Sequence, residues 1–229
     1  MTTLVDEAVR HRWEKEYAKG SEKNYPNIEL VRLEKWFFNN KPGKLIEYGF
    51  GSGVNTLHLA KCGYEINGVD ATYGAIKSAT KKLKTIKHLE PKVSLLRLKE
   101  NAEKLPFEDE TFDYAIIISV ISLLGNYDRI NLVLKEISRI MKPNAKIISD
   151  VNSNNSQFAI DGKNIGNHIF VNSGKEKNQE EIKCFCPDKP DIFRDIFSQY
   201  FTSVDEGISK SLIMNSCTEE FIYCGIKSR

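Results

Sequence analysis

The residues with the clearest chemical potential lie between positions 47 and 70, where three glycines and two carboxylates surround a predicted strand, turn and helix. Gly49, Gly51 and Gly53 directly follow an apolar run at residues 44–48. Glycine permits backbone angles that are closed to other residues and lets main-chain N–H groups approach a ligand. A helix that begins after such a turn offers unpaired donors and partial positive charge. The turn therefore favours an anionic or zwitterionic group.

A carboxylate at the end of the next strand adds a second type of contact. The predicted strand at residues 64–69 leads into Asp70, 17 residues after Gly53. A carboxylate in this place can accept hydrogen bonds from both hydroxyls of a ribose. The turn and Asp70 together predict a pocket for a nucleoside-like cofactor. The alternative is a strand-to-helix turn with a structural role only.

The spacing of the glycines separates two families. Dinucleotide-binding dehydrogenases present G-x-G-x-x-G, and Val54 stands where that pattern needs its third glycine. The sequence instead resembles the class I S-adenosylmethionine-dependent methyltransferases, whose motif is an acid, one residue and G-x-G-x-G, with a second acid closing the next strand. The matching residues are Glu47, Gly49, Gly51, Gly53 and Asp70. The resemblance implies S-adenosyl-L-methionine as cofactor and S-adenosyl-L-homocysteine as product, with an NAD-linked dehydrogenase as the runner-up.

The resemblance also implies cofactor contacts beyond the turn. Ala71 continues the segment after the second strand. Asn101 and Ala102 follow the third strand, where the family places an acid and a backbone segment that bind adenine. The side-chain carbonyl of Asn101 can still accept a hydrogen bond from an exocyclic amine, although without charge. Ser119 and Val120 lie at the end of the fourth strand, where the family's backbone borders the cofactor.

Aromatic residues near the N-terminus resemble the lids of small-molecule methyltransferases. Trp13, Tyr17 and Tyr25 would cover the methionine end of the cofactor, because aromatic faces attract a sulfonium. Trp13 and Tyr17 also have the i, i+4 spacing that would attach an amphipathic helix to the sheet. Methyl transfer needs alignment and desolvation, and a hydroxyl acceptor also needs a proton acceptor. His168 is the candidate base, because imidazoles titrate near neutral pH, with His11 and Tyr25 as rivals and a surface histidine as the alternative.

No metal site is predicted. Asp150 and Asn152 resemble the metal-binding pair of catechol-type methyltransferases, but the third acidic ligand expected after the fourth strand is missing. Cys184 and Cys186 form a C-x-C pair without further Cys or His at zinc spacing. The five cysteines are scattered and fit free thiols in a reducing compartment. Together with an N-terminus that lacks the features of a secretory signal, they predict a cytoplasmic location.

Composition limits the choice of partners. The 229 residues are 41% apolar and 28% charged, which predicts one domain with a sizeable core, or a domain plus a small cap, and no membrane span. Lys and Arg exceed Asp and Glu by only 33 to 31, too little for a nucleic-acid footprint. The fourth strand also lacks the N-P-P-Y, D-P-P-Y and Pro-Cys segments of nucleobase methyltransferases. A small-molecule substrate is therefore expected and nucleic acid is unlikely; the oligomeric state is not predicted.

Apolar periodicity predicts the elements that position these residues. Helices are expected at residues 4–18, 28–38, from 54, 74–88 and 128–141. Strands are expected at residues 44–48, 64–69, 93–98, 112–119 and 146–151, and a helix and strands follow from 190. This alternation predicts an α/β fold with a doubly wound, mainly parallel sheet, which the resemblance makes a seven-stranded Rossmann-like sheet with helices on both faces. The expected units are a helical lid (1–40), a cofactor-binding core (41–151), an insertion or substrate loop (152–188) and a C-terminal helix and strands that complete the sheet (189–229).

The function expected from this resemblance is methyl transfer to an oxygen of a small polar metabolite or a surface-glycan precursor, by analogy at the level of the fold. Two alternatives remain. One is an RNA or protein methyltransferase that uses the basic face formed by Lys77, Lys81, Lys82, Lys84 and Lys87. The other is a noncatalytic subunit that binds S-adenosylmethionine.

Overall fold

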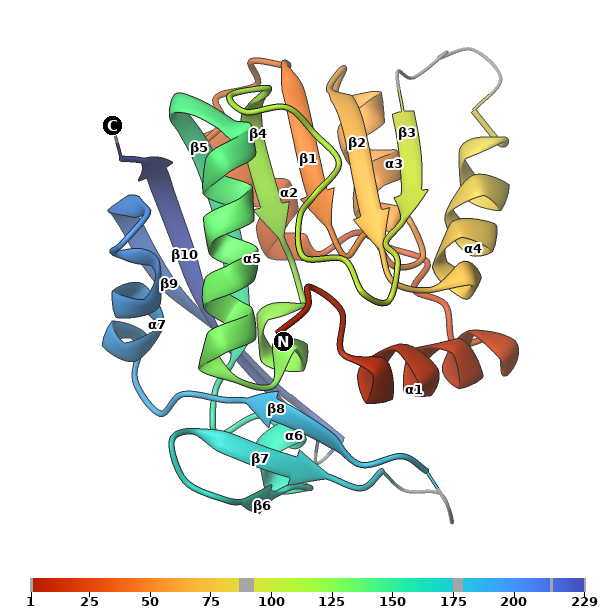
Figure 1. Cartoon of the computed structure of the whole chain (residues 1–229), viewed down its shortest axis with the longest axis vertical. Coiled ribbons are helices and arrows are strands. Elements are labelled where there is room, and N and C mark those ends of the chain that lie inside the picture. The colour runs from red at the N-terminus through yellow and green to blue at the C-terminus, as the bar shows by residue number, and fades with distance from the viewer. Residues whose placement is uncertain (1, 87–92, 175–178, 215, 229) are drawn as a thin grey trace.

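The architecture is built on one twisted sheet (Figure 1). The computed structural model describes residues 2–86, 93–174, 179–214 and 216–228. The strands of the sheet are β1 (Lys44–Tyr48), β2 (Glu65–Asp70), β3 (Val93–Arg97), β4 (Phe112–Ile117), β5 (Met141–Asn152), β9 (Phe201–Ile213) and β10 (Ser216–Lys227). Within the described residues these form a seven-stranded sheet of order β3-β2-β1-β4-β5-β10-β9. The first five strands run parallel, and β10 is antiparallel to both neighbours. The predicted doubly wound, mainly parallel sheet is confirmed.

Helices cover both faces of this sheet. One face carries α2 (Ile28–Trp36), α3 (Val54–Lys61) and α4 (Tyr73–Leu83), and the other carries α5 (Tyr127–Ile140) and α7 (Pro190–Phe197). Figure 1 shows α5 and α7 in front of the sheet, with α2 and α3 behind it. The helix predicted at residues 74–88 ends at Leu83, and its positions 87 and 88 lie outside the described residues. In the part of the chain that the structure describes, no helix combines the length and apolarity required to cross a bilayer.

The apolar run that predicted β1 is buried on both sides. Leu45 packs in a cluster with Leu30 of α2 and Leu59 of α3, whereas Ile46 packs in a cluster with Ile130 of α5. Leu45 and Ile46 have no exposed surface. Strands buried on both faces have continuous rather than alternating apolar character, which explains why residues 44–48 were recognisable from sequence.

Residues 152–188, predicted as an insertion or substrate loop, contain a second, small sheet. The short helix α6 (Gln157–Ile160) precedes the strands β6 (Lys163–Asn164), β7 (Ile169–Asn172) and β8 (Ile182–Phe185), which pair antiparallel. Their apolar side chains pack against residues of α1 (Glu7–Ala18) and of the 3-10 helix η1 (Ile121–Leu124). In Figure 1 the small sheet and α1 lie below the carboxyl ends of the parallel strands. We call α1 and the small sheet, together with the helix α6 that precedes it, the cover.

Helix α1 is attached to the rest of the molecule mainly by polar contacts. The whole of α1 is described, and none of its side chains is fully buried. Arg129 of α5 donates to Asp6 at 2.8 Å, and the first two N–H groups of α4 donate to Glu14 at 2.6 and 3.0 Å. Arg12 donates to the carbonyl and side-chain oxygens of Asn172 in β7 at 3.0 and 3.1 Å. These contacts connect α1 to both helical layers and to the small sheet.

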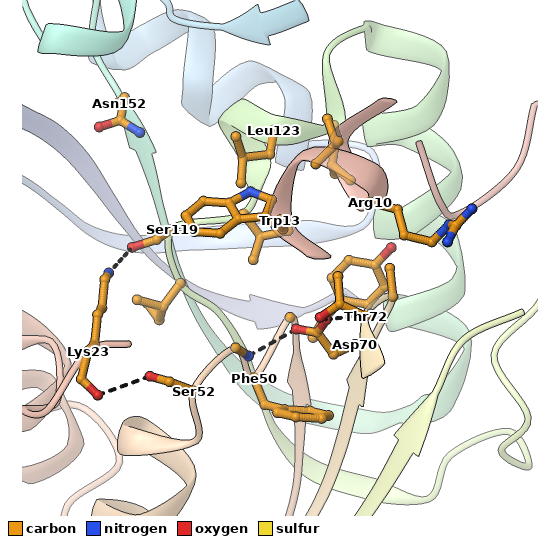
Figure 2. A pocket seen from close by; sticks show the side chains of 18 of the residues that line it. Arg10, Trp13, Lys23, Phe50, Ser52, Asp70, Thr72, Ser119, Leu123 and Asn152 are labelled. Carbon is orange, nitrogen blue, oxygen red and sulfur yellow. Dashed lines mark hydrogen bonds between the residues drawn. The ribbon is translucent and has the colours of Figure 1, made fainter. Parts of the chain in front are cut away.

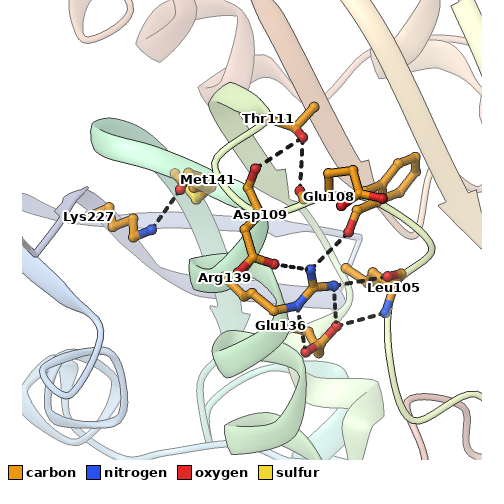
Figure 3. A network of polar contacts seen from close by, with 9 residues as sticks. Leu105, Glu108, Asp109, Thr111, Glu136, Arg139, Met141 and Lys227 are labelled. Atoms are coloured by element: carbon orange, nitrogen blue, oxygen red, sulfur yellow. Dashed lines mark hydrogen bonds and ion pairs between the residues drawn. The ribbon is translucent and has the colours of Figure 1, made fainter.

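An arginine on α5 holds the long connection between β3 and β4, as Figure 3 shows. Arg139 donates to the carbonyl oxygens of Leu105 and Phe107 at 3.0 and 2.9 Å and to Asp109 at 2.6 Å. It also donates to Glu136 at 2.8 Å, and that buried carboxylate accepts the N–H of Leu105 at 2.8 Å. The connection, which contains the predicted adenine-binding segment, is therefore fixed to α5.

We expect Arg139→Ala to lower the free energy of unfolding by about 2–3 kcal/mol, because it leaves the buried Glu136 carboxylate without its charged partner. Urea denaturation followed by circular dichroism measures the loss. Arg194→Ala is the control, since Arg194 pairs with Asp191 on the surface of α7 and its removal should change little. Equal losses for the two variants would contradict this role of Arg139.

Candidate active site

A cavity with a volume of about 390 Å³ lies where β1, β2 and β4 end. Its wall is formed by α1 and the segment after it, the glycine turn, the ends of β2 and β4, α6 and the start of β10. The charged residues on the described wall are Asp6, Arg10, Lys23, Asp70 and Glu220. Open α/β sheets bind ligands at this edge, and the volume is in the range of small-molecule sites.

The glycine turn is possible only without side chains at two of its positions. Gly49 and Gly53 have φ angles of 77° and 76°, in the left-handed region. A Cβ atom on Gly49 would lie 2.4 Å from Val120 Cγ2, and one on Gly53 would lie 2.5 Å from the Cβ of Ala79 in α4. Both approaches are shorter than van der Waals contact, so the turn packs against α4 and the end of β4 through bare backbone. Gly49 and Gly51 line the cavity, whereas Gly53 lies behind its described wall.

Asp70 connects the turn to the neighbouring strand and helix (Figure 2). Its Oδ2 accepts the N–H of Gly51 at 2.9 Å, and its Oδ1 accepts the N–H and the hydroxyl of Thr72 at 2.9 and 2.8 Å. Thr72 in turn caps the N-terminus of α4. Burial raises the pKa of Asp70, and these hydrogen bonds oppose that rise. The carboxylate is thus held at the cavity wall, in the place predicted for ribose recognition.

Glu47, predicted to contact the cofactor, lies behind the turn and not on the described wall of the cavity. It is 2% exposed and accepts a hydrogen bond from the Thr56 hydroxyl of α3 at 2.5 Å. Burial raises the pKa of Glu47 to about 8, more than the Thr56 hydrogen bond lowers it. The structure therefore gives Glu47 a contact between β1 and α3.

Two of the three predicted lid aromatics reach the cavity. Trp13 and Tyr17 line it, with ring centroids 6.4 Å apart. Tyr17 crosses Gly74 of α4 so closely that a Cβ there would lie 2.4 Å from the tyrosine Cβ. Burial and the nearby Asp70 raise the pKa of Tyr17, so its hydroxyl stays neutral. Tyr25 is 83% exposed and does not belong to the described wall.

The remaining predicted cofactor contacts divide between the cavity and its surroundings. Ala71, Ser119 and Val120 line the cavity. Asn101 and Ala102 are absent from the described wall, to which the N-terminal residues Leu4, Val5 and Asp6 contribute instead. The Ala102 carbonyl accepts the N–H of Leu4 at 2.8 Å, and Leu4 itself lines the cavity. Asn101 instead borders a separate surface hollow.

The structure does not bring His168 to the other predicted site residues. It lies in the turn between β6 and β7, with its Nδ1 3.5 Å from Asp188 and its ring edge-to-face with Phe185. Its carbonyl accepts the N–H of Cys186 at 2.8 Å. No atom of His168 contributes to the described cavity wall, so this geometry gives it no direct contact with a reacting group.

One group of potential metal ligands lies away from the cavity wall, between α2 and α3. Glu34, His58 and Cys62 have ligand atoms within 4.8 Å of one another. The Tyr64 hydroxyl donates to Glu34 at 3.0 Å, and the Cys62 sulfur lies 3.8 Å from the His58 imidazole. Burial lowers the pKa of His58 and raises that of Cys62, which favours the uncharged forms of both. The group is thus accounted for by its own hydrogen bonds.

Four charged wall residues were not predicted from the sequence: Asp6, Arg10, Lys23 and Glu220. Lys23, in the segment between α1 and α2, has its Nζ 3.5 Å from the Ser119 hydroxyl (Figure 2). Glu220 reaches the wall from β10, a strand that follows the first motif by more than 150 residues. Its neighbour Glu219 makes different contacts: it accepts hydrogen bonds from Ser153, Asn155 and Lys210 at 2.7, 2.7 and 2.6 Å. Local sequence signals do not show which of two adjacent glutamates faces a cavity.

Comparison with known proteins relates this chain to methyltransferases. Residues 46–149, a little under half of the chain, match the methyltransferase domain family. A demethylmenaquinone methyltransferase of Bacillus cytotoxicus is 35% identical over 112 residues, which cover 47% of this chain and 44% of that protein. The sterol 4-C-methyltransferase strm-1 of Caenorhabditis elegans is 29% identical over 103 residues, covering 45% of this chain and 29% of that protein. The alignments thus span less than half of these relatives.

Solved structures share the fold over most of the chain. The 1,6-didemethyltoxoflavin-N1-methyltransferase of Burkholderia thailandensis, with bound 1,6-didemethyltoxoflavin and S-adenosylhomocysteine, has a TM-score of 0.70 at 13% identity. That similarity covers 97% of this chain and 88% of the other. A methyltransferase of Methanosarcina mazei has a TM-score of 0.69 at 19% identity, covering 80% and 92% of the two chains. The predicted resemblance to class I methyltransferases is confirmed.

We expect Asp70→Ala to weaken binding of S-adenosylhomocysteine by about 1–3 kcal/mol, because a charge-assisted contact to the ribose is lost. Isothermal titration calorimetry measures the affinity. Asp191→Ala, on the surface of α7, is the matched control and should bind like the wild type. Unchanged affinity of the Asp70 variant would remove this residue from the binding site.

Glu47 should make stability depend on pH. Its pKa is about 8 in the folded protein and 4.5 ordinarily, so its contribution is complete below pH 4.5 and is lost as pH rises to about 8. Glu47→Gln removes this dependence, and the variant should gain stability relative to the wild type between pH 5 and 8. Urea unfolding of both proteins across this range measures the difference. A difference that stays constant with pH would show that Glu47 does not titrate in this way.

Proposed function

We propose that this chain is an S-adenosylmethionine-dependent methyltransferase that acts on a small molecule. The main support is the Asp70 carboxylate, which binds the glycine turn and lines a covered cavity inside a methyltransferase domain. A turn without side chains and a fixed carboxylate are what an amino-acid tail and a ribose of one ligand require.

The residues on the wall fit this cofactor. The glycine turn offers its backbone to the amino-acid part, Asp70 accepts from the ribose hydroxyls, and the face of Trp13 suits a cationic sulfur. A bound S-adenosylmethionine supplies an electrophilic methyl group there. The protein's own contributions are alignment of the acceptor and exclusion of water by the cover.

The cover limits the size of the acceptor. With α1 and α6 both on the cavity wall, a volume of about 390 Å³ suits a small molecule better than a duplex or a folded protein. The acceptor atom we propose is an oxygen, bound near Ser119, Lys23 and Glu220. Apolar side chains of Val9, Leu123 and Phe158 on the same wall favour a less polar acceptor than a glycan precursor.

The basic face considered for an RNA or protein substrate receives less support. Lys82 donates to Glu22 at 2.6 Å and to Ser78 at 2.9 Å, so one of its lysines is engaged within the protein. Lys87 lies outside the described residues. Affinity for RNA that falls steeply with salt would be the sign of this alternative.

Binding of the product tests the cofactor assignment directly. We expect S-adenosylhomocysteine at 100 times its dissociation constant to stabilise the fold by about 2.7 kcal/mol and to raise the melting temperature. NAD at the same concentration should have no effect, because its pyrophosphate needs a different glycine pattern. Differential scanning fluorimetry makes the comparison. A shift with NAD and none with S-adenosylhomocysteine would refute the proposal and favour a dehydrogenase.

A further inference from the structure

We propose that Glu220 is the general base of the reaction, that Lys23 holds the acceptor oxygen, and that the acceptor is a hydroxyl of the phenol or enol class. This inference rests on the proposed function and adds the catalytic groups and the substrate class. It is carried by four residues from four separate segments that meet at one end of the cavity: Lys23, Ser119, Asp150 and Glu220.

Strand pairing places the two carboxylates side by side. Glu220 of β10 pairs with Asn152 of β5, two residues along that strand from Asp150. Because side chains alternate along strands, Asp150, Asn152 and Glu220 lie on the same face of the sheet. Glu220 lines the cavity, whereas Asp150 is 3% exposed and accepts the N–H of Ser119 at 2.5 Å. Glu220 is therefore the carboxylate available to a ligand.

Lys23 completes the group from the opposite side. Its Nζ is 3.5 Å from the Ser119 hydroxyl, and its carbonyl accepts the Ser52 hydroxyl at 3.2 Å, which fixes the segment before α2 to the glycine turn. Figure 2 shows Lys23 and Ser119 together on one side of Trp13, with Asp70 on the other side in this view. The Lys23 cation thus lies on the side of Trp13 away from the ribose position in this view.

The charges of this group match a neutral acceptor. Burial raises the pKa of both carboxyls, and repulsion by Glu220 helps to raise that of Asp150 to about 8. Lys23 opposes both rises, and Glu29 of α2 adds to the rise at Glu220. Burial and mutual repulsion thus disfavour two negative charges in this group, and the Lys23 ammonium lies beside it at Ser119. A cationic amine would be repelled by this ammonium, whereas a neutral hydroxyl group would not.

The acidity of the hydroxyl follows from the strength of the base. A phenol has a pKa of about 10, and an alcohol is comparable to water, at about 16. Burial raises the pKa of the Glu220 carboxyl, which brings it nearer to that of a phenol, and proton transfer is effective only when the two values are close. The apolar wall residues Trp13, Leu123 and Phe158 provide surface for a planar ring.

Methyl transfer to the acceptor oxygen is accompanied by loss of the hydroxyl proton. The acceptor O–H bond breaks and its proton goes to the Glu220 carboxylate, while the Lys23 ammonium stabilises the negative charge left on oxygen. A lone pair of that oxygen forms the bond to the methyl carbon. The carbon–sulfur bond breaks, and its electron pair stays on sulfur as a neutral thioether. Glu220 returns its proton to water afterwards.

Simple hydroxyl compounds test this inference. Wild type, Glu220→Gln and Lys23→Met are assayed with S-adenosylmethionine and phenol, the more acidic 4-nitrophenol, benzyl alcohol or benzylamine, with methylated product measured by mass spectrometry. Glu206→Gln is the control, because Glu206 lies on β9 outside the described cavity wall and accepts from Ser203. Calorimetry with S-adenosylhomocysteine accompanies each variant.

We expect the wild type and the control to methylate both phenols and neither benzyl compound. Glu220→Gln should lower kcat/KM for phenol by about 100-fold or more, remove its decline toward acidic pH and leave S-adenosylhomocysteine affinity within about twofold. The loss should be much smaller for 4-nitrophenol at a pH where it is already ionised, because that acceptor needs no base. Lys23→Met should also lower kcat/KM, and by a larger factor for phenol than for 4-nitrophenol.

Three results would overturn the inference while leaving the proposed function intact. They are preference for benzylamine, equal losses in Glu220→Gln for both phenols, and no methylation of either phenol by a wild type that binds S-adenosylhomocysteine. A wild type that does not bind S-adenosylhomocysteine would instead refute the proposed function, and the assignment of Glu220 with it.

Discussion

The hydrogen bond from the Gly51 N–H to the Asp70 carboxylate is the contact on which the site depends. It joins the turn after β1 to the end of β2, and the same carboxylate accepts from Thr72 at the start of α4. The first turn of α4 in turn donates to Glu14 of α1, the helix that carries Trp13. The glycine turn and the start of α4 are thus held in place by hydrogen bonds to the Asp70 carboxylate. Trp13 is positioned by the same carboxylate indirectly, through the contact of α4 with α1. Its burial makes this arrangement specific, because few donors can reach it.

The two parts of the cover are attached by different forces. The small sheet buries Phe170, Ile182 and Cys184 against neighbouring apolar residues, so its position depends on area removed from water. Helix α1 has no fully buried side chain along its described length; besides the apolar contacts of Ala8, Val9 and Tyr17, its attachments are ion pairs and hydrogen bonds to Arg129, α4 and Asn172. Partly exposed polar contacts exchange for water at small cost in free energy.

What could be predicted from the sequence was local. Residues 44–48 form β1 as predicted, because a strand buried on both faces is a continuous apolar run, and the three glycines were recognisable from their spacing alone. Asp70 was predicted in the same way. The short strands of the small sheet were not distinguished, since β7 and β8 contain four residues each and β7 lies among Asn, Ser and Gly.

The parts of the site that were not predicted depend on contacts between distant segments. Asn101 follows β3 as expected, but Leu4 pairs with Ala102 and lines the cavity instead. His168 was placed in a loop over the site, and it packs instead on Phe185 within the small sheet. Lys23 and Glu220 meet only because β10 inserts antiparallel beside β5.

The adjacent glutamates of β10 have different roles: Glu219 makes structural hydrogen bonds, whereas Glu220 is the proposed catalytic base. Hydrogen bonds from Lys210 and Ser153 lower the pKa of Glu219 to about 2, so its carboxyl group is ionised at neutral pH. Its hydrogen bond with Ser153 holds the end of β5 in place. Glu220, one residue later, has the opposite shift and a different neighbourhood. Loss or gain of one amino acid in the hairpin during evolution would exchange the two, because every side chain of the strand would change sides. Descendants of this chain can therefore alter their chemistry by a change in length while every glutamate is retained.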